Sequence, residues 1–403
     1  MKKRTALKLF ATALLAGGVL AACSNDSAEN ANSQENTSTE ETEKETETAD
    51  ENEGQTEVSS IEKQVTAYKE MKAELEKMKE DKEVDWSIVS TQYTENLQSE
   101  INKSNGEFDQ AISAAIAAGE SGELEQNVAR QIIDKVTQSY FYSKQKSLHK
   151  DVVAALEAGN AEEAKMLFGE IKHLANEVFI PTAVKRDEYY KLEGDQSMEQ
   201  NINAGLAAQE EALNNENVED YKVFTQLTDK SIYRSYYLAA NSYAEKIGAA
   251  IKEGASETDL QIKQAEGWGF LQAIKGSLAG GDEQAAAKLD ELFSLDKTDA
   301  KTIDPAEIDQ LFTKAILGKA KSYHDKTAAA LEEGKNVDAR VKALEGNMFT
   351  KMIELELIES LGEEKANQVF EHAEAWFNAV TEQNAEEAKM HSDEVLALLQ
   401  ELE

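Results

Sequence analysis

The chain has 403 residues, with 78 Asp and Glu against 42 Lys and Arg, which gives a formal net charge of -36. So acidic a chain repels phosphate backbones, which excludes nucleic acid as a partner, because nucleic-acid affinity comes largely from Lys and Arg. Two prolines are few for the many turns of an all-β fold, and a single cysteine excludes both an internal disulfide and a zinc site built on cysteines.

Residues 1–22 have the make-up of an export signal, with a basic start and then an apolar run from Leu9 to Ala22. The run is shorter than the roughly 20 residues that a membrane-spanning helix needs. It ends in Leu20-Ala21-Ala22-Cys23, which resembles the lipobox of bacterial lipoproteins. The resemblance implies cleavage before Cys23 and acylation of that residue, and two or three acyl chains anchor a protein stably.

We therefore expect an extracytoplasmic protein that is lipid-anchored to the cell membrane through Cys23. The absence of disulfides suits the outer face of a Gram-positive cell, while a Gram-negative envelope stays open as an alternative. An ordinary signal peptide that happens to end near a cysteine is the alternative to the lipobox.

Residues 23–60 form a polar stretch that differs from the rest of the chain. From Ser24 to Ser60 it holds twelve acidic residues against Lys44 alone, with almost nothing apolar. Such a composition cannot bury a core, and its charges repel one another. The stretch is predicted to be a disordered acidic tether that holds the following body away from the membrane.

From residue 61 on, apolar residues recur at steps of three and four, which is typical of amphipathic helices. Ile61, Val65 and Tyr68 begin the first such face. Asp85 and Asp304 have the positions of helix N-caps, and glycines such as Gly254 follow the ends of helical patterns. Since no strand alternation is evident, the body is predicted to be all-α.

The body also repeats itself. Ser242 to Lys246 corresponds to Ser322 to Lys326 at an offset of 80 residues, with Phe108 to Gly119 as a third copy, and Ala161 to Met166 recurs letter for letter as Ala385 to Met390. Such copies indicate duplication, with a period far longer than that of tetratricopeptide repeats. The predicted fold is all-α, with about three tandem duplicated helical bundles behind the tether. The predicted bundles cover residues 61–195, 196–300 and 301–403.

Two segments place a carboxylate and an imidazole one helical turn apart. Glu170 and His173 have the spacing used in di-iron carboxylate bundles, although such sites need two of these units and two further Glu. His391-Ser392-Asp393-Glu394 resembles the Gly-x-His-x-x-Glu motif of the imelysin-like iron-uptake family, with Lys389 in place of the glycine. The resemblance implies a helical, exported protein and makes His391 and Glu394 candidate metal ligands. A solvated helix surface is the alternative for both pairs.

Clusters of aromatic residues lie in or beside the repeats. Because adjacent aromatics cannot share one helix face, some of them point away from the local core, into an interface between bundles or a ligand groove. Packing between helices is the alternative. The candidate residues are Tyr140, Tyr142, Tyr236, Tyr237, Trp268 and Trp376.

The sequence contains no nucleophile elbow, no phosphate-binding glycine loop and no His-Glu-x-x-His motif. We therefore expect a protein that is not an enzyme and needs no cofactor. The expected function is that of a lipid-anchored binding protein that captures a small ligand, a cation or a partner protein at the cell envelope. An envelope scaffold without a ligand, and a helical metal-dependent enzyme or iron-uptake-associated protein, are the alternatives.

Overall fold

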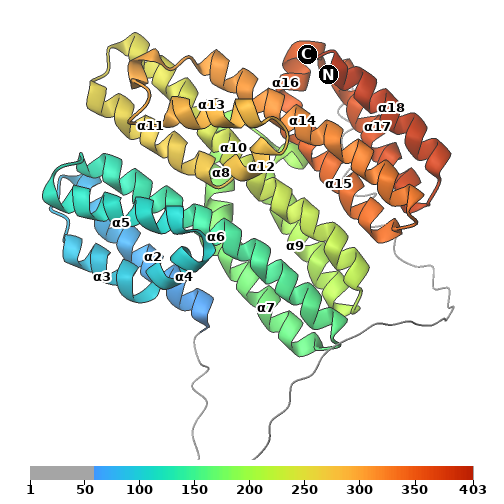
Figure 1. The fold of residues 1–403 in the computed structure, drawn as a ribbon, viewed down its shortest axis with the longest axis horizontal. Helices are drawn as coiled ribbons and strands as arrows, with labels where there is room; N and C mark the ends of the chain where they lie inside the picture. The colour runs from blue at the N-terminus through green and yellow to red at the C-terminus, as the bar shows by residue number, and fades with distance from the viewer. Residues whose placement is uncertain (1–58, 403) are drawn as a thin grey trace, which may run out of the picture.

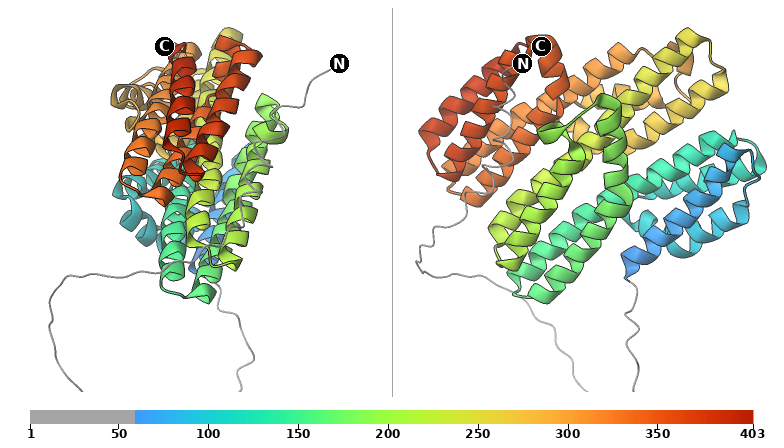
Figure 2. Two further views of the ribbon diagram at one scale, coloured as in Figure 1. Left: turned by 90° about the vertical axis from the view of Figure 1, so that its right-hand side faces the viewer. Right: turned by 180° about the vertical axis from the view of Figure 1, so that it is seen from behind.

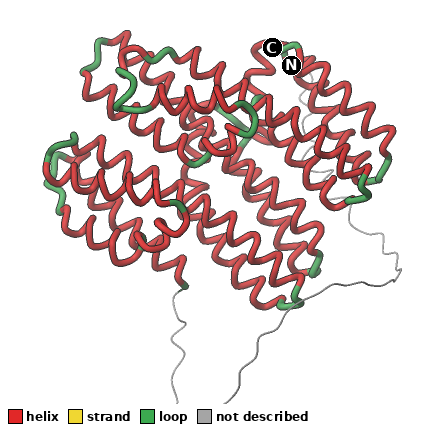
Figure 3. Tube along the Cα trace, in the orientation of Figure 1, coloured by secondary structure: helices red, strands yellow, loops and turns green. Residues whose placement is uncertain are grey.

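A computed structural model describes residues 59–402, so the predicted signal, Cys23 and nearly all of the tether lie outside the described residues. Within that range every regular element is a helix, which confirms the all-α prediction (Figures 1 and 3). The α-helices are α2 (Ser60–Glu76), α3 (Trp86–Asn96), α4 (Gln98–Ser104), α5 (Gly106–Ser121), α6 (Gln126–Glu157), α7 (Ala161–Leu174), α8 (Ile180–Tyr190), α9 (Met198–Asn214), α10 (Val218–Glu253), α11 (Glu257–Gln272), α12 (Lys275–Ala279), α13 (Glu283–Phe293), α14 (Pro305–Glu332), α15 (Asn336–Met352), α16 (Glu354–Leu361), α17 (Glu363–Thr381) and α18 (Ala385–Gln400).

Local chemistry sets the helix ends. Ser59 and Glu62 form a reciprocal capping box at the start of α2, with both hydrogen bonds at 3.2 Å. Asp85 and Asp304 cap α3 and α14 because their side chains accept hydrogen bonds from backbone N–H groups in the first turn. Gly254 ends α10 with φ of +76°, in the left-handed region that glycine adopts without strain. The predicted starts and this end are confirmed.

The long helices α6, α10 and α14 connect the lobes of the molecule (Figure 1). One part of α6 packs with α2 and α5 and another with α7, while α10 packs with α9 and α11. In turn, α14 packs with α13 and α15, and the C-terminal α17 and α18 close the last lobe, as the views in Figure 2 also show. Each long helix therefore belongs to two neighbouring groups of helices.

The three long helices share one register. Asp134 in α6, Asp229 in α10 and Asp309 in α14 are related by offsets of 95 and 80 residues, and the same offsets relate the glycines that follow these helices. These are Gly159, Gly254 and Gly334, with φ of +75°, +76° and +70°. The offset of 80 seen in the sequence thus extends over whole helices.

This register also locates the remaining copy of the Ser242 to Lys246 segment. The matching segment is Ser147 to Asp151 in α6, whereas the expected copy at 108–119 lies in α5, the hairpin partner of α6. The main apolar core runs from Ile61 on α2 to Leu399 on α18. The main core therefore extends through successive helical groups, because the long helices pass from one group into the next. A smaller, separate apolar cluster around Trp376 packs α15, α17 and α18 together.

Candidate functional site

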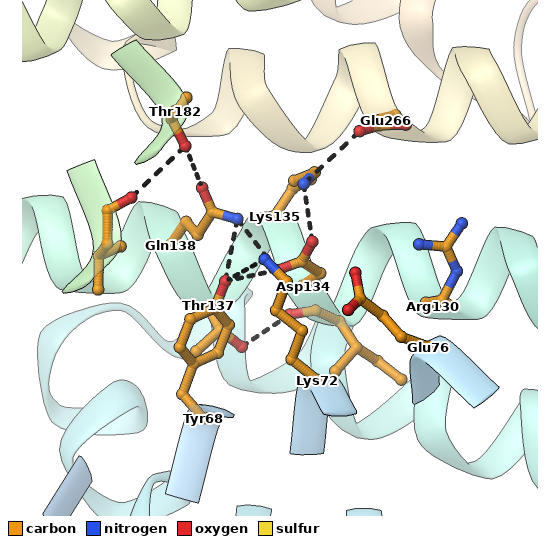
Figure 4. A network of polar contacts seen from close by, with 12 residues as sticks. Tyr68, Lys72, Glu76, Arg130, Asp134, Lys135, Thr137, Gln138, Thr182 and Glu266 are labelled. Atoms are coloured by element: carbon orange, nitrogen blue, oxygen red, sulfur yellow. Dashed lines mark hydrogen bonds and ion pairs between the residues drawn. The ribbon is translucent and has the colours of Figure 1, made fainter. Parts of the chain in front are cut away.

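Two clusters of buried charged side chains lie where the long helices cross. The first cluster is centred on the adjacent Asp134 and Lys135 of α6, whose side chains are only 4% and 10% exposed and whose charged groups lie 2.7 Å apart (Figure 4). From α2, Tyr68 donates a 2.5 Å hydrogen bond to Asp134 Oδ1, and Lys72 Nζ lies 3.6 Å from the same oxygen. The carboxylate is thus enclosed by groups of two helices.

The other side of Lys135 faces α10 and α11. Its Nζ lies 3.5 Å from Glu266 Oε1 and 4.9 Å from the centre of the Phe270 ring. Tyr243 of α10 stacks on Phe270 with 6.1 Å between centroids, and Lys246, one turn further, lies 4.1 Å from the Tyr243 ring centre. Four helices, α2, α6, α10 and α11, therefore meet at the first cluster.

Electrostatics keep the central pair charged. Burial by itself would raise the pKa of Asp134, but the ammonium groups of Lys135 and Lys72 and the hydrogen bond from Tyr68 outweigh it and hold that pKa well below its usual range. Burial would likewise lower the pKa of Lys135, but Asp134 and Glu266 outweigh it and raise that pKa. Gln138 adds hydrogen bonds of 3.0 Å to both Tyr68 and Asp134.

The second cluster is built in the same way from α6, α10, α14 and α15. Lys230 Nζ lies 2.5 Å from Asp229 Oδ2 and 2.9 Å from Glu345 Oε1. The ring centre of Phe349 is 5.5 Å from Lys230 Nζ, and Tyr323 stacks on Phe349 with 5.6 Å between centroids. The opposing charges of Asp229 and Glu345 outweigh burial and raise the pKa of Lys230.

The two clusters correspond residue by residue. Tyr68, Lys72, Asp134, Lys135, Tyr243, Lys246, Glu266 and Phe270 of the first match Tyr142, Lys146, Asp229, Lys230, Tyr323, Lys326, Glu345 and Phe349 of the second. Lys326, for example, lies 4.4 Å from the Tyr323 ring centre, as Lys246 does at 4.1 Å from Tyr243. The contacts of the first tyrosine differ, since Tyr142 donates to the backbone oxygen of Asp229, at 3.3 Å, and Lys146 Nζ lies 4.0 Å from its ring centre.

At the third position in this register the constellation changes. Asp309 of α14 is followed by Gln310 instead of a lysine, and it accepts a 3.0 Å hydrogen bond from Asn241. Tyr237, the counterpart of Tyr142, donates to Glu356 of α16. Burial raises the pKa of Asp309, and burial raises the pKa of Glu356 to about 7. The full constellation therefore occurs at the first two positions of the register.

The aromatic candidates lie mostly between packed helices. Tyr140, Tyr142, Tyr236, Tyr237 and Trp376 are at most 2% exposed, whereas Trp268 is half-buried. Tyr142 belongs to the second cluster, and its ring lies 5.5 Å from that of Tyr236. Trp376 stacks on His324 at 3.9 Å. Adjacent aromatic residues are thus both buried where other helices pack against more than one side of a long helix.

The metal-ligand candidates are not brought together. Glu170 and His173 are half-buried on α7, and Glu394 is exposed on α18. His391 instead contacts His372 of α17, with 3.0 Å between their Nδ1 atoms, and its Nε2 is 3.9 Å from Glu387. Across residues 59–402 there is no group of three or more His, Cys, Asp and Glu side chains arranged to hold a metal ion.

Of the residues in both clusters, sequence reasoning proposed only Tyr142 as a functional candidate. Two signals could have found the others. One is the recurrence of Asp134-Lys135 as Asp229-Lys230, and the other is Glu266-Gly267-x-x-Phe270 recurring as Glu345-Gly346-x-x-Phe349.

Comparison with known proteins gives no relative from which a role could be transferred. No protein-family model matches the chain, and no match was found among curated proteins or among solved structures. Among the helices of the described range, none is long and apolar enough to cross a membrane.

Proposed function

We propose that the protein is a lipid-anchored, extracytoplasmic binding protein that captures a small ligand at the two matched clusters. The observation that carries the proposal is the retention of the same eight side-chain types at two places built from different helices. Replacing buried ion pairs by apolar residues of similar volume is often neutral or stabilising, so packing alone gives little reason to keep such pairs twice. Duplicated charges with a shared geometry favour a role in recognition.

Each cluster also runs from a buried centre to the solvent. Lys135 is 10% exposed, while Lys72 beside it is 31% exposed, and the corresponding Lys230 and Lys146 are 8% and 40% exposed. A ligand at the outer lysine would therefore lie close to charges held in a low-dielectric environment, where electrostatic interactions are stronger than in water.

Binding can be tested with the purified full-length protein by calorimetry and thermal shift against anions, cations, sugars and amino acids. Two sites per chain are expected, and Lys72→Ala and Lys146→Ala should each remove one of them. Lys63→Ala, an exposed residue of the same helix α2, is the matched control. Unchanged binding in both cluster variants, or no binding across the whole panel, would contradict the proposal.

The anchor is tested separately in cells. The apolar run followed by Leu20-Ala21-Ala22-Cys23 supports acylation of Cys23. Cys23→Ala should abolish incorporation of a labelled fatty acid and move the protein out of the detergent-rich phase on detergent partition. Retention of both properties in this variant would exclude Cys23 as the anchor.

An envelope scaffold is the second candidate, and the ion pairs of Asp134 with Lys135 and of Asp229 with Lys230 favour it, because buried ion pairs can also fix how helices cross. A scaffold should tolerate substitution of Trp268, Tyr236 and Tyr237 wherever folding survives. The half-buried Trp268 is the most informative of these residues, because it can be changed at the least cost to the core. Loss of a captured envelope partner from a folded Trp268→Ala variant would argue against a passive spacer.

A further inference from the structure

Arg186 of α8 is a buried guanidinium without a carboxylate partner. The residue is 7% exposed, and its Nη1 donates a 2.6 Å hydrogen bond to Ser242 Oγ of α10. Its Nε has no hydrogen-bond partner, and within the described part of the chain no carboxylate oxygen lies within the 4.0 Å of an ion pair. Since arginine stays charged and buried charges are normally paired, Arg186 lacks a counter-ion.

Lys246 of α10 is a second cation without a carboxylate partner. It lies one helical turn after Ser242, on the same face of α10. Its ammonium group is held between the rings of Tyr189 and Tyr243, at 4.9 and 4.1 Å from their centres, and among residues 59–402 it makes neither an ion pair nor a hydrogen bond. Burial, followed by the charge of Arg186, lowers the pKa of Lys246 to about 8.

The carboxylates near these cations are engaged elsewhere. Glu245 accepts 2.9 Å hydrogen bonds from the hydroxyls of both Tyr189 and Tyr190, and Glu266 pairs with Lys135. Arg186 is buried and Lys246 is half-buried, and the described residues place no carboxylate within ion-pair distance of either cation. Local positive charge of this kind favours a bound anion.

We propose that Arg186 and Lys246, the latter a member of the first cluster, bind a small oxyanion, a carboxylate or a phosphate. The inference rests on the proposed function and names the class of its ligand. The planar guanidinium offers paired donors that match two oxygens of a carboxylate or phosphate, and Lys246 adds a point charge. Tyr189 and Tyr243 would flank the ligand with their rings, which restricts its size.

The second cluster carries a less elaborate version of this arrangement. Lys319 of α14 has no counterpart in the first cluster, because the equivalent position in α10 is Ala239. Its Nζ lies 5.2 Å from the Tyr323 ring centre and 5.3 Å from that of Phe349, and in the described range this ammonium group has neither an ion pair nor a hydrogen bond. Because an ammonium group lacks the donor fork of arginine, the anion should bind more weakly here than at Arg186.

The probes are inorganic phosphate and malonate, titrated into the full-length protein at constant ionic strength set with chloride. Binding of an oxyanion should give a calorimetric heat signal and raise the unfolding temperature of the protein. Whether phosphate or malonate binds shows whether the natural ligand carries a phosphate or a carboxylate. Lys246→Gln should weaken binding at least tenfold, and Arg186→Lys should weaken it by a similar factor by removing the donor fork. Lys252→Gln, which changes an exposed residue of the same helix α10, is the control and should leave affinity unchanged.

Because Arg186 is buried, the fold of its variant is checked by circular dichroism, and the half-buried Lys246 provides the independent variant. Equal oxyanion affinity in wild type and Lys246→Gln overturns the inference, as does the absence of oxyanion binding. If a neutral or cationic ligand binds and Lys72→Ala removes that binding, the oxyanion inference fails while the proposed function stands. If no ligand of any class binds, both fail.

Discussion

The hydroxyl of Tyr68 on α2 donates a 2.5 Å hydrogen bond to the carboxylate of Asp134 on α6, and its counterpart Tyr142 on α6 reaches the backbone oxygen of Asp229 on α10. Each of these helices therefore presents its tyrosine to the aspartate position of the next long helix. Equivalent positions therefore meet twice, although Tyr68 reaches the carboxylate and Tyr142 the backbone, and both contacts link helices that lie far apart in the sequence.

Removing one charged member of the first cluster should lower the free energy of unfolding substantially. Asp134→Ala leaves Lys135 buried without its closest counter-charge, and breaking a buried pair from one side typically costs about 3–5 kcal/mol. Urea unfolding followed by circular dichroism measures the change in the free energy of unfolding. The double variant Asp134→Leu with Lys135→Met should recover part of the loss, because no unpaired charge then remains.

Asp151→Ala is the matched control for that experiment, since Asp151 is exposed on the same helix α6. Its effect should lie within about 0.5 kcal/mol of zero, as is usual for surface substitutions. A loss below about 1 kcal/mol for Asp134→Ala would mean that the cluster contributes little to the fold.

Glu356 makes stability depend on pH. It is buried on α16, its Oε1 accepts a hydrogen bond from Tyr237, and its Oε2 has no partner. Burial raises its pKa to about 7 in the folded state, above the usual value of 4.5. Between these values the folded protein binds the proton more readily than the unfolded chain does, so this group's contribution to stability falls as pH rises from about 4.5 past 7.

Glu356→Gln removes that ionisation. The free energy of unfolding is measured for both proteins at each pH. From pH 5 to pH 8, the variant's value should rise relative to that of the wild type by roughly 2–3 kcal/mol. Glu359→Gln, which changes an exposed residue of the same helix, should show no such trend. A stability difference that stays constant across this range would show that Glu356 does not hold its proton.

His324 gives stability the opposite pH dependence, because its contribution is lost as pH falls. Its ring stacks on Trp376 at 3.9 Å, and its Nδ1 lies 2.7 Å from Ser392 Oγ. Burial lowers the pKa of His324 to about 4, so the unfolded chain binds its proton more readily. The stability that this residue contributes is present above about pH 6.5 and is lost as pH falls through 4.

His324→Phe should keep the ring stack and remove the titration. The wild type should lose about 3 kcal/mol more than this variant between pH 7 and pH 3.5, after the lost Ser392 contact is subtracted at pH 7. Thermal unfolding at a series of pH values measures the difference. Parallel acid profiles for the two proteins would place the His324 pKa near its ordinary value.

The helices could be predicted from the sequence because their signals are local. Asp304 caps α14 through its own side chain, and Gly254 ends α10 through its own φ angle. The clusters could not, because Tyr68, Asp134 and Glu266 meet only once three helices have packed, and no periodicity along one helix reports that meeting. Buried Tyr236 illustrates the same limit, since an off-face aromatic has the same pattern whether a ligand or another helix covers it.

Close packing against α14 gives the last prediction. A Cβ added at Gly281 would lie 2.0 Å from the backbone oxygen of Ala315, and one at Gly318 would lie 2.4 Å from the oxygen of Gly281. Because each added Cβ would meet a backbone atom, the clash cannot be relieved by a change of side-chain rotamer. Gly281→Ala should therefore destabilise the protein by at least the ~1–3 kcal/mol typical of overpacking. Gly169→Ala on α7, where nothing lies within 4 Å, should instead stabilise by about 0.5–1 kcal/mol through helix propensity. Chemical denaturation of both variants tests the contrast, and equal effects would mean that the turn at Gly281 can move away from α14.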